Sequence, residues 1–213
     1  MGKLKLQLLI PTVVSRPEYF ERLVERLAPQ LKDGVEVVVL WNNFERGIGE
    51  IRQLMMESAT AEYIMFIDDD DMVPEDFIET VYPLLDGVDY IGWKVDFTSN
   101  GKKMKLNSHS IKHRGWYDDN EGFFRQVVHK NPVRRELALK ARYDQGWPED
   151  YTWSIAVSPH AKTEHYIDRE MYHYDHNYDT SLYLGDRLHP REGEFTRPKL
   201  PKGFKYHPLS TKG

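Results

Sequence analysis

The sequence contains no cysteine. This excludes disulfides, thiolate metal ligands and a thiol nucleophile, so carboxylates and histidines would have to hold any bound metal. No apolar run approaches the roughly 20 residues of a membrane-spanning helix, and residues 1–5 lack the layout of a signal peptide. We therefore expect a soluble cytoplasmic protein with no membrane span.

Length and charge predict one domain with an added tail. The 213 residues are 40% apolar, which is enough for one sizeable core. Residues 1–184 are predicted to form this domain, and residues 185–213 a basic tail, rich in proline and glycine, that is extended or disordered unless bound. Residues 1–100 carry 9 Lys/Arg and 19 Asp/Glu, whereas residues 101–213 carry 20 and 15. The basic half is a candidate surface for an anionic partner, although a solvated surface of mixed charge also explains it.

The first hundred residues alternate strand-like and helix-like segments, which predicts a sheet flanked by helices. Ser15 and Glu18 suggest a capping box for the first helix, and Pro74 suggests the start of the third. After residue 97 the pattern weakens into a functional loop to about residue 129. The predicted strands are 5–10, 35–40, 63–67, 90–97, 165–167 and 170–174, and the predicted helices are about 15–31, 49–59, 74–85, 133–142 and one from 148.

Four successive aspartates, 68–71, follow the third predicted strand. Like charges this close repel one another, and a cation would remove that penalty. In an extended segment Asp68 and Asp70 share a face, and such a pair offers the oxygen ligands that Mg²⁺ or Mn²⁺ prefers. A solvated acidic loop or an acidic helix start explains the same residues without a metal. A phosphoryl-transfer or hydrolytic metalloenzyme would also use aspartates at a strand end.

The order of motifs resembles the family-2 glycosyltransferases with the GT-A fold. The resemblance covers about residues 4–180 and rests on Ile10-Pro11-Thr12, the segment 47–52, the Phe66 to Asp71 block, and Pro148-Glu149-Asp150 followed by Trp153. It implies an α/β, Rossmann-like mixed sheet, with residues 1–97 binding the nucleotide sugar and 98–184 the acceptor. It also implies inverting transfer of a sugar from a nucleotide-diphosphate donor, and we expect a UDP-sugar.

The resemblance implies roles for particular residues on the donor side. Asp70 corresponds to the carboxylate that holds Mn²⁺ or Mg²⁺, and a late histidine, His176 or alternatively His173, completes the site. Where the family commonly carries an acid after the second strand, this chain has Asn42 and Asn43, which leaves the donor base open. The residues expected to bind the donor are Pro11, Thr12, Asn42, Asn43, Arg52, Asp68 and Asp69. Arg52 could equally be an exposed helix arginine.

On the acceptor side, Asp150 matches the family's catalytic base, with Glu149 as a supporting group. An inverting displacement needs only one such base. The alternative is that these acids merely suit a helix start.

Basic and aromatic side chains follow one another through the second half of the chain, which suits a phosphate backbone and an unstacked base. The layout is also similar to small phage-encoded glycosyltransferases, some of which act on hydroxymethylated pyrimidines in DNA, so we expect such an acceptor, reached by base flipping. A saccharide or protein acceptor, or a non-catalytic nucleic-acid-binding protein, is the alternative. The residues expected to bind the acceptor are Trp116, Arg134, Arg135 and Trp153.

Overall fold

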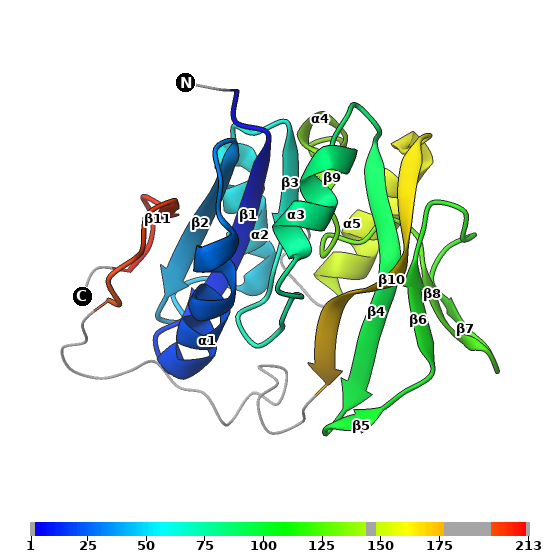
Figure 1. Ribbon diagram of the computed structural model, residues 1–213, viewed down its shortest axis with the longest axis horizontal. Coiled ribbons are helices and arrows are strands. Elements are labelled where there is room, and N and C mark those ends of the chain that lie inside the picture. Colours follow the sequence, from blue (N-terminus) through cyan, green and yellow to red (C-terminus); the bar gives the residue numbers. More distant parts are fainter. Residues whose placement is uncertain (1–2, 144–147, 177–196, 212–213) are drawn as a thin grey trace.

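The computed structural model describes residues 3–143, 148–176 and 197–211. One sheet runs through this part of the chain, with helices on both faces (Figure 1). The strands are β1 (Leu6–Val13), β2 (Val35–Asn42), β3 (Tyr63–Phe66), β4 (Tyr90–Ser99), β5 (Lys102–Lys103), β6 (Leu106–His109), β7 (Tyr117–Asp118), β8 (Gly122–Arg125), β9 (Val133–Arg134), β10 (Glu164–His176) and β11 (Phe204–Tyr206). Their order is β11-β2-β1-β3-β9-β4-β6-β8-β7, and β10 and β5 also pair with β4.

The parallel strands β2, β1 and β3 form the centre of the donor half. All eight residues of β1 are buried, as expected for a strand with neighbours on both edges and helices on both faces. Because these strands are parallel, their carboxyl ends meet at one edge of the sheet, where ligands bind in open α/β folds. Asn42 ends β2, and the aspartates follow β3 at this same edge.

Two apolar clusters fill the space between sheet and helices. Helices α1 (Pro17–Leu27) and α3 (Phe77–Val81) pack on one face. Helices α2 (Ile48–Ser58), α4 (Arg135–Ala138) and α5 (Glu149–Val157) pack on the other (Figure 1). Within the described residues, no helix is long and apolar enough to cross a membrane. The predicted α/β fold with a mixed sheet is confirmed.

Several predicted segments differ in the structure. Residues 98–129 are not a loop, because β5 to β8 extend the sheet beyond β4. The helix predicted at 133–142 is the two-residue strand β9, wedged between β3 and β4, followed by the short α4. The two late strands are one, β10, with register irregularities between Ile167 and Tyr172.

The predicted helix starts are also displaced. Ser15 does not cap α1, since Arg16 takes the N-cap position and no side chain caps the helix. Arg16 instead extends its guanidinium to the aspartates, which sets the turn after β1. Similarly, α3 begins at Phe77 rather than at Pro74.

Part of the predicted tail belongs to the sheet. Strand β11 pairs in parallel with β2, from Phe204 opposite Val37 to Tyr206 opposite Val39. Residues 185–196 of that tail lie outside the described residues. Residues 197–211 therefore form an edge of the donor half rather than a separate extension.

Candidate functional site

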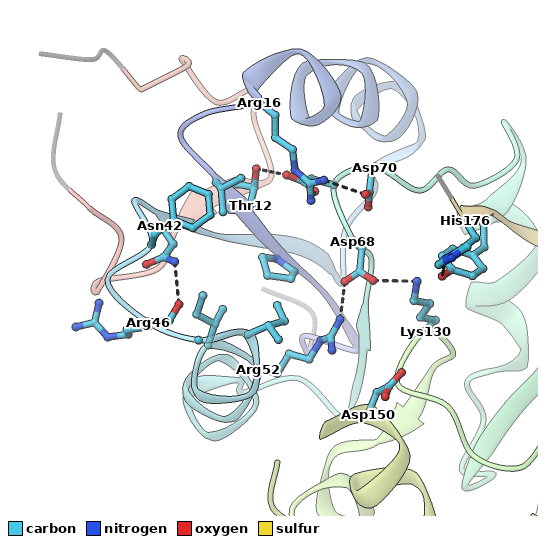
Figure 2. Close-up of a pocket in the computed structure, with 18 of the residues that line it drawn as sticks. Thr12, Arg16, Asn42, Arg46, Arg52, Asp68, Asp70, Lys130, Asp150 and His176 are labelled. Carbon is cyan, nitrogen blue, oxygen red and sulfur yellow. Dashed lines mark hydrogen bonds and ion pairs between the residues drawn. The ribbon is translucent and has the colours of Figure 1, made fainter. Parts of the chain in front are cut away.

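A cavity of about 370 Å³ opens at the carboxyl ends of β1, β2 and β3. This volume lies in the range of small-molecule sites. Its wall combines acidic, basic and apolar side chains drawn from both halves of the chain (Figure 2). The predicted site residues that line it are Pro11, Thr12, Asn42, Arg52, Asp68, Asp69, Asp70, Asp150 and His176.

Burial alternates along the aspartate run, but not because the run is extended, as was predicted. Asp69 and Asp70 form a turn, which the Asp71 amide closes by donating to the Asp68 carbonyl at 3.1 Å. Asp69 and Asp71 are 0% and 1% exposed, whereas the side chains of Asp68 and Asp70 are 20% and 26% exposed. Of the four, Asp68 and Asp70 are therefore the most accessible to a ligand.

Arg16 holds the second and third aspartates. Its Nη2 bonds Asp69 and its Nη1 lies 2.9 Å from Asp70 Oδ2. The Thr12 hydroxyl donates to the other Asp69 oxygen at 2.6 Å. The end of β1, the turn that follows it and the loop past β3 are thereby tied together.

Arg52 and Lys130 hold the first and fourth aspartates. Asp68 lies 2.9 Å from Arg52 Nη2 and 2.9 Å from Lys130 Nζ. Lys130 also pairs with Asp71 at 2.5 Å, and the Tyr172 hydroxyl donates to Asp71 at 2.6 Å. Lys130 thus bridges the two ends of the aspartate run.

These pairings set the charge states of the site. Burial acts to raise the pKa of Asp68, but Lys130 and Arg52 outweigh it and hold that pKa well below the usual range. Burial raises the pKa of Asp69 and of Asp71 to about 7, against the opposing effects of Arg16 and Lys130. Asp68 is therefore ionised at neutral pH.

The two acidic side chains at the start of α5, Glu149 and Asp150, point in different directions. Asp150 lines the cavity (Figure 2), and its Oδ1 accepts from the Tyr151 amide at 2.8 Å. Glu149 is 1% exposed and turns inward to pair with Arg52. Asp150 is the member placed to act on a ligand, while Glu149 holds Arg52 in position.

The two candidate histidines lie differently. His176 lines the cavity, and its Nδ1 lies 3.2 Å from the Tyr174 hydroxyl. His173 Nδ1 lies 2.8 Å from Asp96 and faces a neighbouring groove, which Asp70 also borders. Of the two, His176 shares the cavity with Asp70 and Asp68.

The cavity is suited to a metal that a ligand helps to hold. Among the described residues no group of three or more His, Asp or Glu is arranged to hold a metal. A Mg²⁺-type ion, however, is commonly bound by one or two carboxylates together with substrate phosphates. The lining contains five carboxylates and four basic side chains, so an anionic diphosphate would need an added cation. Asp70 and His176, which were predicted to bind a metal, both line this cavity.

The predicted acceptor residues are not brought together. Arg134 pairs with Tyr63 at the amino end of β3, and Arg135 follows it, so both lie at the opposite end of that strand from the aspartates. Trp153 is 1% exposed and stacks on Tyr143 in the core. Trp116 lies beside α5, where its Nε1 donates to the Ser154 hydroxyl at 2.7 Å.

Several residues of the site were not predicted. Arg16 could have been found, because the turn after β1 must lie at the same sheet edge as the residues after β3. Lys130 could not, since its position depends on the insertion of β9 between β3 and β4. Phe44 and Arg46 also line the cavity, and Asn43 does not line it although Asn42 does.

Comparison with known proteins identifies the fold. TarS from S. aureus is 17% identical with a TM-score of 0.63, over 80% of this chain and 36% of TarS. A structure of its residues 1–349 in complex with UDP is 16% identical with a TM-score of 0.63, over 80% of this chain and 60% of that one. A third similar structure is glucosyl-3-phosphoglycerate synthase from Mycobacterium tuberculosis in complex with Mn²⁺, UDP and glucosyl-3-phosphoglycerate. It is 12% identical with a TM-score of 0.52, over 79% of this chain and 71% of that one.

The chain thus spans about a third of full-length TarS and 60% of the shorter form. A search of curated proteins gives no match. The sequence profile of glycosyl transferase family 2 matches residues 10–140, which is more than half of the chain. This chain belongs to glycosyl transferase family 2.

Proposed function

We propose that this glycosyltransferase takes its sugar from a UDP-sugar and transfers it with inversion, using the cavity at the ends of β1, β2 and β3 as the donor site. The observation that carries the proposal is the joint lining of that cavity by Asp68, Asp70 and Asp150. The UDP complexes of two structural neighbours support uridine as the base.

In this mechanism the acceptor oxygen attacks the anomeric carbon while the bond from that carbon to the diphosphate breaks. Asp150, which lines the cavity, accepts the proton of the acceptor hydroxyl as the general base. Arg52 and Lys130 fix Asp68 beside the bound nucleotide. Because both contacts are made within the chain, they hold Asp68 in place for the reaction.

Asp70 and His176 are proposed to hold Mn²⁺ or Mg²⁺. When bound, the ion neutralises the charge that develops on the leaving diphosphate, as a Lewis acid. The Mn²⁺ complex of glucosyl-3-phosphoglycerate synthase supports this choice.

For the acceptor, we propose a hydroxymethylated pyrimidine in DNA. What supports it is a surface beside α5 on which the Arg125 guanidinium lies 5.1 Å from the Trp116 ring and Trp116 lies 5.5 Å from Tyr151. Aromatic faces with a cation suit an unstacked base next to phosphate. Tyr151 follows Asp150 directly in α5, so this surface adjoins the part of the helix that lines the cavity.

The donor proposal is tested by incubating the protein with a panel of UDP-sugars and Mn²⁺ and measuring released UDP. Asp70→Asn and added EDTA are each expected to lower the rate at least tenfold, and Asp33→Asn, an exposed acid away from the cavity, to leave it unchanged. Turnover that survives both treatments would refute the metal assignment. Release of inorganic phosphate alone would instead favour a hydrolytic metalloenzyme.

The acceptor proposal is tested by mass spectrometry of nucleosides from hydroxymethylated DNA treated with the protein and the donor panel. A hexose added to the hydroxymethyl nucleoside is expected. If that nucleoside stays unmodified while a saccharide or protein acceptor is glycosylated, the DNA proposal is refuted. If DNA binds but no donor turns over, a non-catalytic nucleic-acid-binding role is favoured.

A further inference from the structure

The C-terminal segment, residues 197–211, reaches the carboxyl end of β2, where the cavity opens. After β11, the Ser210 hydroxyl donates to the Val39 carbonyl at 3.1 Å, and the Thr211 amide donates to the Trp41 carbonyl at 2.7 Å. Arg197 Nη2 in turn donates to the Ser210 carbonyl at 2.8 Å. The segment therefore continues the sheet edge up to the loop that follows β2.

Thr211 clamps that loop on both sides of Phe44. Its hydroxyl accepts from the Asn43 amide at 3.2 Å and donates to the Glu45 carboxylate at 2.8 Å. A second bond closes the same loop, from Asn42 Nδ2 to the Arg46 carbonyl at 3.1 Å. One side chain of the C-terminal segment thus fixes both neighbours of Phe44.

Phe44 has a backbone conformation that needs such support. Its φ is +62°, in the left-handed region that residues with side chains rarely adopt. Strained residues of this kind persist only where their surroundings hold them, and they gather at ligand sites. Phe44 lines the cavity together with the aspartates, and it is half-buried.

The position of Phe44 matches one end of a nucleoside diphosphate. Strand β1 separates β2 from β3, so their ends lie on the order of 10 Å apart, two strand spacings. In a nucleoside diphosphate, the base ring and the diphosphate lie on opposite sides of the ribose, at a separation of this order. Figure 2 shows Asn42 and Arg46 on one side of the cavity and Asp68 and Asp70 on the other. A diphosphate beside the aspartates would therefore direct its base toward Phe44.

We propose that Phe44 is the stacking surface for the donor's nucleobase and that Thr211 is the residue that positions it. The C-terminal segment is then a part of the donor site. This inference rests on the proposed UDP-sugar donor.

The first test is calorimetric titration of UDP, and separately of inorganic pyrophosphate, into the protein with Mn²⁺. Phe44→Ala is expected to weaken UDP binding about tenfold or more, the usual effect of losing a base–aromatic stack, and Phe44→Tyr to keep it. Pyrophosphate, which has no base, should bind all variants equally. An equal loss for both ligands would mean that the substitution disrupts the whole cavity, and unchanged UDP binding would refute the stacking role.

The second test addresses Thr211. Thr211→Val keeps the shape but loses both hydrogen bonds, so UDP affinity is expected to fall about fivefold while pyrophosphate affinity stays constant. Thr211→Ser should restore UDP binding, and Leu209→Ala, an exposed residue of the same segment, should have no effect. Failure of Thr211→Ser to restore binding, or a matching loss in Leu209→Ala, would overturn the positioning role.

The two proposals fail in different ways. If the unmodified protein binds no UDP, the proposed donor is refuted and this inference with it. If the unmodified protein binds UDP and the Phe44 and Thr211 variants bind it equally well, only this inference is refuted.

Discussion

Arg52 is the residue whose replacement tests the electrostatic design of the site most sharply. It is 5% exposed and pairs with Asp68 and Glu149, two carboxylates from different parts of the chain. Burial acts to lower its pKa, but these two carboxylates raise it above the ordinary value, so the guanidinium is always charged. In Arg52→Met the side-chain volume is largely kept and the charge is lost.

The loss of stability expected in Arg52→Met follows from the partners that Asp68 and Glu149 keep without the arginine. Asp68 keeps Lys130 at 2.9 Å, whereas the second oxygen of Glu149, Oε2, has no hydrogen-bond partner among the described residues. Removing one member of a buried ion pair costs about 3–5 kcal/mol. At about 2–4 °C per kcal/mol for a chain of this size, the melting temperature should fall by about 6–20 °C.

The assay is thermal unfolding at pH 7 of three variants beside the unmodified protein. Arg142→Met removes an arginine that is 77% exposed and lies 3.6 Å from Glu57, so it should cost less than about 1 kcal/mol. The double variant Arg52→Met, Glu149→Gln should regain at least half of the loss, because no unpaired carboxylate remains beside the missing arginine. A loss in Arg52→Met no larger than in Arg142→Met, or a double variant no more stable than Arg52→Met, would refute the reasoning.

Three further predictions concern other parts of the molecule. Burial lowers the pKa of His109 to about 3. The contribution of His109 to stability is therefore complete above about pH 6.5 and is lost as the pH falls toward 3, by up to about 1.4 kcal/mol per pH unit. His109→Gln should flatten the decline of melting temperature between pH 7 and 4, and an unchanged slope would contradict this. Trp116→Ala should raise the KM for the acceptor about tenfold while the dissociation constant for UDP stays constant, as measured by steady-state kinetics and calorimetry, and a weakened UDP affinity would place Trp116 in the donor site instead. Gly34→Ala should lower the free energy of unfolding by about 1–2 kcal/mol in urea, since φ is +85° there and the added Cβ would meet the Tyr82 hydroxyl; a neutral effect would show that the turn adapts.

The sequence was most informative where local pattern and tertiary role agree. The apolar runs that became β1, β2 and β3 are buried on both faces, so their composition alone predicts strands. The same parallel arrangement places Asp68 to Asp70 at the carboxyl edge, which is why the predicted donor side was largely brought together.

The prediction failed where structure depends on long-range pairing. Strands β6 to β8 are short and partly exposed, so they show little periodicity, and they form because β4 offers an edge. Arg134 and Arg135 were grouped with the acceptor side by composition, but β9 turns them to the amino end of β3. Charge counts cannot distinguish the two ends of a strand.

The same limit applies to the charges around the aspartates. A metal was predicted to relieve their repulsion, and the structure shows that Arg16, Arg52 and Lys130 relieve much of it within the chain. Each of these three residues lies more than thirty positions from the next along the sequence, so no local motif predicts that they come together. The proposed ion would therefore serve mainly to neutralise the bound diphosphate next to Asp70.

The most direct test of the donor site is a crystal structure of the protein with UDP and Mn²⁺, with the metal located by its anomalous scattering. The account predicts an Mn²⁺ peak in contact with Asp70 and the diphosphate, inside the cavity at the ends of β1, β2 and β3. A nucleotide bound elsewhere on the molecule, or a metal that makes no contact with Asp70, would contradict it.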